Sequence, residues 1–199
     1  MAEQAARRVP GEKIWWWPNV LTYGRIAAVP VLAALIMYST HGARWVALLI
    51  YIVAAVTDFF DGYLARIWKQ QSALGRMLDP IADKVLVSVV LLALAAADEL
   101  NGGHLWAAII ILSREVLVSG LREFLGELRV SVPVTQIAKW KTTVQLVAVG
   151  FLISGPAGDA LLPGISQAGL VLLWIAAGLT LYTGYDYFRA GLRHVVDEE

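Results

Sequence analysis

Apolar residues in this chain gather into long blocks separated by short polar stretches, rather than recurring as the narrow stripes of amphipathic soluble helices. Each block is close to the roughly 20 residues that a helix needs to cross the hydrocarbon core of a bilayer. The blocks predict six membrane-spanning helices, over residues 19–38, 44–66, 78–97, 105–125, 137–153 and 165–188. The predicted fold class is therefore all-α: a polytopic membrane protein with six transmembrane helices and a short N-terminal interfacial segment.

This pattern divides the chain into an interfacial segment at 1–18, a six-helix membrane domain at 19–190 and a cytoplasmic tail at 191–199. The first part combines Lys13 with the tryptophans at 15–17. Tryptophan favours the headgroup layer of a bilayer, so we expect this segment to lie along the membrane surface.

Turn-forming runs at 39–42, 101–103 and 155–158 predict three loops on one side of the membrane. These loops carry Arg44 as their one cation, whereas most Lys and Arg residues lie in the other loops and at the two termini. By the positive-inside rule, both termini face the cytoplasm.

Composition supports a membrane protein without a separate soluble domain. Of the 199 residues, 58% are hydrophobic and 16% are charged, whereas a soluble domain carries about 25% charged residues. The chain has no cysteine, which excludes disulfides and thiolate chemistry. No cleavable signal peptide is evident, because the first residues lack a short apolar core followed by a small-residue cleavage site.

Four acids interrupt the second and third apolar blocks: Asp58, Asp61, Asp79 and Asp83. A carboxylate at bilayer depth costs roughly 2.5–3.5 kcal/mol on insertion scales, so intramembrane acids usually mark a functional site. The first two share one helical face, as do the last two. Because a short connection joins the two helices, we expect antiparallel neighbours whose acidic faces converge near the cytoplasmic side.

Carboxylate oxygens of this kind suit Mg²⁺ or Mn²⁺, and four of them can bridge two ions. One carboxylate can also take a proton from an attacking hydroxyl. Three small residues, Gly62, Ala65 and Gly75, would let a ligand approach the backbone closely. The alternative is that the acids form structural salt bridges with nearby cations, namely Arg66, Arg76 and Lys84.

The whole string reads Asp58-x2-Asp61-Gly62-x2-Ala65-Arg66-x8-Gly75-x3-Asp79-x3-Asp83. It resembles the signature of the CDP-alcohol phosphatidyltransferase family at every fixed position. The resemblance implies a six-helix membrane fold, usually a homodimer, with two divalent cations held by Asp58, Asp61, Asp79 and Asp83. It also implies that Asp83 is the catalytic base, and that the CDP-lipid is bound by Asp58, Gly62, Ala65, Arg66 and Gly75.

Other segments resemble the bacterial members of this family that make phosphatidylglycerophosphate. The first, at 17–25, is similar to Asn-Pro-Asn-x-Leu-Thr-x-x-Arg, with Trp17 in place of the first Asn and with Thr22 and Arg25 matched. Segments 113–123 and 138–145 are also similar to that group.

Four cations in these segments suit an anionic acceptor: Arg114, Arg122, Lys139 and Lys141. The two arginines are eight residues apart and share a helical face, where an arginine is costly unless it meets an anion or a wet cavity. Together the four cations would hold the phosphate of sn-glycerol 3-phosphate. Alternatively, the lysines only set topology, Arg122 extends to the headgroups, and Arg114 pairs with a neighbouring glutamate such as Glu115.

The predicted reaction transfers a phosphatidyl group from CDP-diacylglycerol to sn-glycerol 3-phosphate and releases CMP. One alternative is a transferase of the same family with another acceptor, such as inositol phosphate, serine or phosphatidylglycerol. Another is a divalent-cation transporter, although neither broken helices nor an inverted repeat is visible. We expect an integral protein of a bacterial inner membrane with its active site facing the cytoplasm, and no nucleic-acid partner.

Overall fold

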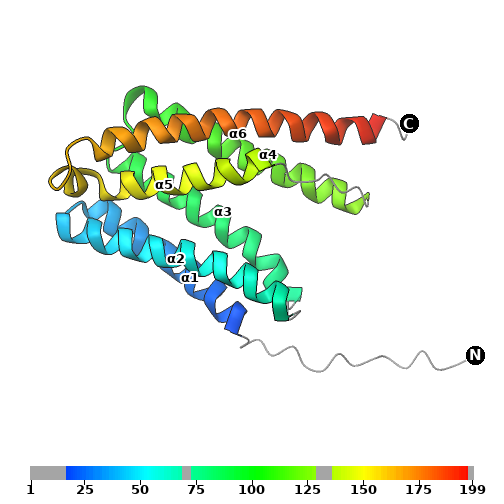
Figure 1. Cartoon of the computed structure of the whole chain (residues 1–199), viewed down its shortest axis with the longest axis horizontal. Helices are drawn as coiled ribbons and strands as arrows, with labels where there is room; N and C mark the ends of the chain where they lie inside the picture. Colours follow the sequence, from blue (N-terminus) through cyan, green and yellow to red (C-terminus); the bar gives the residue numbers. More distant parts are fainter. Residues whose placement is uncertain (1–16, 69–72, 129–135, 197–199) are drawn as a thin grey trace, which may run out of the picture.

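The computed structural model describes residues 17–68, 73–128 and 136–196. Within these ranges, the side chains of residues 17–20, 59–68, 73, 74, 76, 127 and 192–196 lie outside the description. The described chain is helical and contains no strand (Figure 1). Its elements are α1 (Trp17–Tyr38), α2 (His41–Trp68), α3 (Ala73–Ala96), the short 3-10 helix η1 (Gly102–His104), α4 (Leu105–Glu127), α5 (Gln136–Asp159) and α6 (Ile165–Val196).

Each predicted apolar block lies in one long helix, so the all-α prediction is confirmed. Four helices are long and apolar enough to cross a bilayer, with spans at Leu21–Tyr38, His41–Asp58, Gly102–Gly126 and Ile165–Gly191. Helices α3 and α5 do not meet the same criterion. Both carry charged residues in their first half, including the aspartates of α3 and the lysines of α5. Membrane crossing by these two helices stays a prediction.

The predicted loop at 155–158 is confirmed only as a break at Gly155, because helical structure resumes directly after it and extends to Asp159. The helix is kinked at Gly155, whose φ of 44° and ψ of −131° are non-helical, and Pro156 follows directly. Glycine adopts positive φ at little steric cost, and proline is a common cause of helix kinks. The Gly-Pro pair therefore interrupts the helix at Gly155, and a second short helical stretch follows directly.

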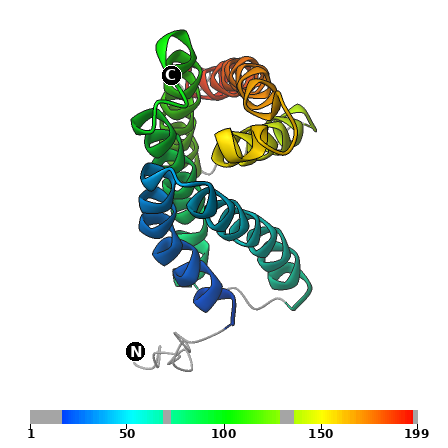
Figure 2. The same ribbon diagram turned by 90° about the vertical axis from the view of Figure 1, so that its left-hand side faces the viewer.

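The helices form two groups of three. Helix α1 packs on α2 and α3, while α6 packs on α5 and α4, and the two groups meet chiefly where α2 contacts α5 (Figures 1 and 2). At that junction Tyr51 Oη donates a hydrogen bond to the backbone oxygen of Leu146, 3.3 Å away. Within the described ranges, α1 lies against both α2 and α3, and the two make few direct contacts with each other. Their predicted packing as antiparallel neighbours stays a prediction, because the side chains at the ends that their connection joins lie outside the description.

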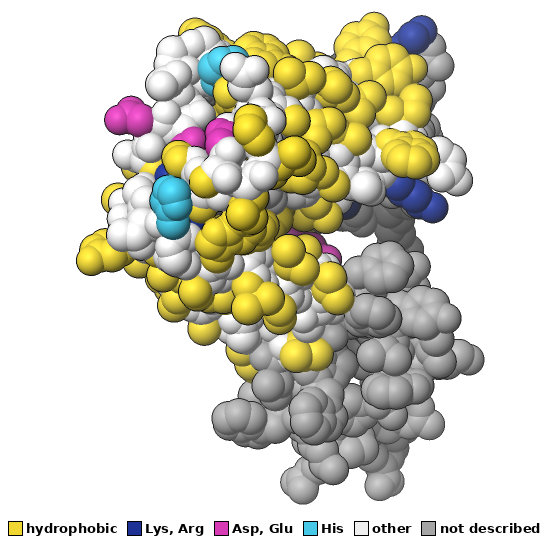
Figure 3. All heavy atoms as spheres, turned by 60° about the vertical axis from the view of Figure 1, so that its left-hand side comes forward, with side chains coloured by type: hydrophobic (Ala, Val, Ile, Leu, Met, Phe, Trp, Pro, Cys, Tyr) yellow, Lys and Arg dark blue, Asp and Glu magenta, His cyan; other side chains and the backbone are white. Residues whose placement is uncertain are grey.

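A buried apolar core joins both groups, with side chains that include Leu32, Leu94, Ile111, Leu152 and Leu173. Large apolar side chains also cover much of the outer surface, as expected for a protein surrounded by lipid (Figure 3).

Arg44 lies in the first turn of α2, as the predicted span at 44–66 has it, and not in the preceding loop; only 2% of its side chain is exposed. Its Nη2 lies 2.7 Å from Glu99 Oε1 and 3.1 Å from Ser39 Oγ. Its Nη1 lies 3.4 Å from the backbone oxygens of Leu152 and Ile153, just before the kink. This buried pair ties α2 to α5 and to the chain after α3, at the start of α2 and thus away from the aspartates.

Candidate active site

Helix α1 gathers the aspartates of α2 and α3. Arg25, which is almost fully buried, places Nη1 2.5 Å from Asp58 Oδ1 and 2.6 Å from Asp83 Oδ1. One turn earlier, the buried Thr22 donates a hydrogen bond from Oγ1 to Asp79 Oδ1 at 2.6 Å. The structure therefore brings together three of the four predicted carboxylates. These carboxylates meet on α1, a third helix, rather than at a direct contact between α2 and α3.

The remaining residues of the motif are only partly described. Asp61, Gly62, Ala65 and Arg66 belong to the helical backbone of α2, and their side chains lie outside the described residues. Gly75 is buried in the first turn of α3.

The three described carboxylates offer only hard oxygen donors, which is the ligand chemistry of Mg²⁺ and Mn²⁺. Two of them already share one cationic group, the Arg25 guanidinium. Asp58 and Asp83 remain 41% and 48% exposed, so a solute can reach them. Among the described side chains, no three acids are close enough to hold one ion by themselves. The chemistry of these oxygen donors fits a divalent cation.

A second charged cluster joins α4, α5 and α6. Lys141 on α5 donates a hydrogen bond from Nζ to Glu115 Oε1 on α4, and Arg114 Nη1 lies 3.4 Å from the same oxygen. Arg114 Nη2 also donates to Thr183 Oγ1 on α6, 3.1 Å away. Two of the four predicted acceptor-site cations are thus close together, with Glu115 as their shared counter-ion.

The other two predicted cations lie nearer the surface. Arg122 is exposed and its guanidinium carbon lies 5.6 Å from the centre of the Tyr187 ring, within the range of a cation–π contact. Lys139 is exposed, while Lys141 two residues later is buried. Residues two apart on a helix do not face the same way, so the two lysines cannot contact a small ligand from the same face.

Residues 15–182 match the family model of the CDP-alcohol phosphatidyltransferases, which spans the aspartates and all four cations.

The chain belongs to the CDP-alcohol phosphatidyltransferase family.

Three relatives align with this chain over nearly their whole length. A protein from Cereibacter sphaeroides is 42% identical over 93% of this chain and 99% of its own. One from Rickettsia bellii is 44% identical over 87% of this chain and 93% of its own. One from Escherichia coli K12 is 36% identical over 91% of this chain and 97% of its own. Each is named CDP-diacylglycerol–glycerol-3-phosphate 3-phosphatidyltransferase.

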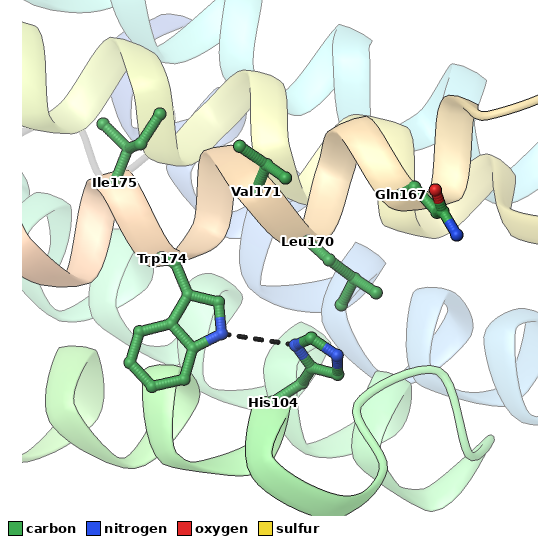
Figure 4. Close-up of a pocket in the computed structure, with 6 residues that line it drawn as sticks. All are labelled: His104, Gln167, Leu170, Val171, Trp174 and Ile175. Atoms are coloured by element: carbon green, nitrogen blue, oxygen red, sulfur yellow. Dashed lines mark hydrogen bonds between the residues drawn. The ribbon is translucent and has the colours of Figure 1, made fainter.

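Cavities lined by described residues also lie away from the aspartates of this phosphatidyltransferase. One of about 530 Å³ lies beside α6 near the start of α4, where Trp174 Nε1 donates a hydrogen bond to His104 Nδ1 at 3.2 Å (Figure 4). It is mostly apolar and contains none of the motif residues. An apolar groove of about 370 Å³ lies between α2 and α5 beside their contact. Another, of about 460 Å³, lies between α4 and α6 and is lined in part by Arg114.

Sequence reasoning gave no role to Thr22 or Arg25, although both contact the aspartates. Arg25 lies inside an apolar span, where an arginine needs an anion. The argument that singled out Arg114 applies to Arg25 equally and would have predicted its ion pairs. Thr22 offered no comparable physical signal, because a threonine can satisfy its hydroxyl within its own helix. Its one signal was its matched position in the family-like segment at 17–25.

Proposed function

We propose that this member of the family transfers the phosphatidyl group of CDP-diacylglycerol to sn-glycerol 3-phosphate, giving phosphatidylglycerophosphate and CMP. The observation that carries the proposal is the convergence of Asp58, Asp79 and Asp83 on α1. It occurs in a chain whose near full-length relatives are named for this donor and this acceptor.

In this proposal Asp58, Asp61, Asp79 and Asp83 hold two divalent cations, Mg²⁺ or Mn²⁺. Members of this family are generally divalent-cation dependent, and the all-oxygen donor set suits such ions. When bound, these cations would polarise the donor pyrophosphate and offset the charge on the departing phosphate.

Asp83 is proposed as the base. Its carboxylate is about half exposed, so an acceptor hydroxyl can reach it. As the 1-hydroxyl oxygen bonds to the β-phosphorus, its proton passes to Asp83 and the bond from that phosphorus to the CMP oxygen breaks. CMP leaves with the bonding electron pair, and Asp83 later returns its proton to water.

The donor's CDP moiety is assigned to Asp58, Gly62, Ala65, Arg66 and Gly75. Glycine at a buried position such as Gly75 leaves room for close approach to the backbone. Arg66 near the end of α2 would pair with a phosphate of the donor. The acyl chains would stay in lipid.

The acceptor phosphate is assigned to direct contacts with Arg114 and Lys141, while Arg122 and Lys139 add positive charge nearer the surface without sharing those contacts. Glu115 neutralises only one of the two inner charges, so this cluster keeps a net positive charge for a phosphate. We also propose, from the family resemblance, that the protein lies in a bacterial inner membrane with its active site facing the cytoplasm, and that it forms a homodimer.

The test is CMP release by purified protein with CDP-diacylglycerol, Mg²⁺ and a panel of alcohols. We expect release with sn-glycerol 3-phosphate and none with inositol phosphate, serine or phosphatidylglycerol. Asp83→Asn should abolish release, whereas Asp98→Asn, at an exposed position beyond the far end of α3, should not. Release by Asp83→Asn at the wild-type rate would remove Asp83 as the base.

A further inference from the structure

Helix α1 contributes no residue to the aspartate motif, yet two of its side chains reach three of the motif's acids. Thr22 and Arg25 are one turn apart and so share a helical face. Thr22 contacts Asp79 at 2.6 Å, and Arg25 contacts Asp58 at 2.5 Å and Asp83 at 2.6 Å. Both α1 side chains are at most 3% exposed, so these contacts are shielded from bulk water.

This arrangement compensates for the weak packing between the two acidic helices. Helices α2 and α3 scarcely touch within the described ranges, while α1 packs on both. The acids also repel one another, and like charges this close favour separation of the helices that carry them. Something must therefore hold the carboxylates in register before a cation binds.

We propose that Thr22 and Arg25 are positioning residues that assemble the aspartates in advance of cation binding. The proposal rests on the proposed function, because it concerns the same divalent-cation site. Thr22 fixes the orientation of Asp79, and Arg25 is a built-in counter-ion that holds Asp58 beside Asp83.

The Thr22 contact engages one oxygen of the Asp79 carboxylate. The contacts of Thr22 with Asp79 and of Arg25 with Asp58 and Asp83 all reach the Oδ1 atom of the carboxylate. A hydrogen bond to a ligating carboxylate fixes its orientation, and loss of such a partner typically lowers metal affinity about 10–100-fold.

Arg25 acts through charge as well as geometry. A planar guanidinium with several donors can bridge two carboxylates. Because Asp58 Oδ1 and Asp83 Oδ1 lie within 2.6 Å of the same nitrogen, Arg25 keeps carboxylates from two helices adjacent despite their repulsion. A bound divalent cation supplies the same attraction, so the need for Arg25 should be greatest in metal-free protein.

The first experiment measures Mn²⁺ binding to detergent-purified protein by electron paramagnetic resonance of the free ion. We expect Thr22→Val to weaken binding about 10–100-fold and Thr22→Ser to restore it. The matched control is Thr180→Val, because Thr180 is fully buried and its hydroxyl has no hydrogen-bond partner among the described residues. Wild-type affinity in Thr22→Val, or equal weakening in both valine variants, would overturn the role of Thr22.

The second experiment measures thermal unfolding by tryptophan fluorescence with and without saturating Mn²⁺. Arg25→Gln should melt below wild type in metal-free buffer, and the gap should narrow with Mn²⁺. In metal-free buffer the melting temperature of Arg25→Lys, which keeps the charge, should lie between those of wild type and Arg25→Gln. An equal gap in both buffers would mean that Arg25 is only a packing residue and would overturn its role as counter-ion.

Failure of the proposed function gives a different result. If wild-type protein binds no Mn²⁺, the divalent-cation chemistry itself is wrong. If wild type binds Mn²⁺ and the Thr22 and Arg25 variants match it, only the positioning role is wrong.

Discussion

Removal of the Glu99 carboxylate should lower the stability of the protein and leave its specific activity unchanged. Arg44 is 2% exposed and Glu99 is 14% exposed, and the two form an ion pair at 2.7 Å. Breaking a buried pair by removing one partner typically costs about 3–5 kcal/mol, because the other charge stays buried. Glu99 is slightly exposed, and Arg44 keeps contacts with Ser39 and two backbone oxygens. We therefore expect about 3 kcal/mol for Glu99→Ala, at the lower end of that range.

A loss of this size lowers the melting temperature by roughly 6–12 °C in a chain of this length. Tryptophan fluorescence during heating of the detergent-purified protein measures it. Asp98→Asn is the matched control, because the neighbouring acid is exposed and asparagine tolerates its φ of 60°. Specific activity at low temperature should be unchanged in both variants, since this pair lies away from the aspartates. A melting temperature within 2 °C of wild type for Glu99→Ala would refute the reasoning.

Three further changes have defined outcomes. Gly155→Ala should cost about 1–3 kcal/mol, because residue 155 has a φ of 44° and a Cβ there would lie 2.7 Å from the neighbouring guanidinium; thermal unfolding measures this. Lys141→Met should raise KM for the acceptor far more than KM for the CDP-lipid, and Lys139→Met should do so less, because only Lys141 is buried against an acid; steady-state kinetics with each substrate varied separates them. The pKa of Asp159 is held below its usual range chiefly by Ser166, whose backbone N–H donates a hydrogen bond to Asp159 Oδ1 at 3.0 Å. Because the folded-state pKa is depressed, the stability that Asp159 confers is present above its unfolded pKa of about 3.9 and is lost as pH falls through the folded value. The melting-temperature gap between wild type and Asp159→Asn should therefore close in acid.

The helices could be predicted from sequence because each apolar block is long and continuous. The kink at Gly155 could not, because a Gly-Pro pair is equally typical of a turn. Which outcome occurs depends on tertiary contacts, here the Arg44 side chain beside that glycine.

The acidic site could be predicted in its residues but not in its assembly. Helical periodicity placed Asp79 and Asp83 on one face, and the structure brings both to α1. Periodicity carries no information about which third helix covers that face. Periodicity does predict that Lys139 and Lys141 face different sides of their helix, because residues two apart do not share a face.

The junction between α2 and α5 joins two halves that hold different reactants in the proposed reaction. The aspartates belong to α2 and α3, whereas Arg114 and Lys141 belong to α4 and α5, so the distance between nucleophile and phosphorus depends on how the halves meet. A displacement of about 1 Å can cost on the order of 100-fold in rate. The groove of about 370 Å³ at this junction is lined by Tyr51 and Gly150 and is almost wholly apolar. Surrounding lipid or detergent can therefore contact the junction between α2 and α5, which sets how the two reactants align. Turnover should vary with the lipid or detergent used, even where the fold does not change.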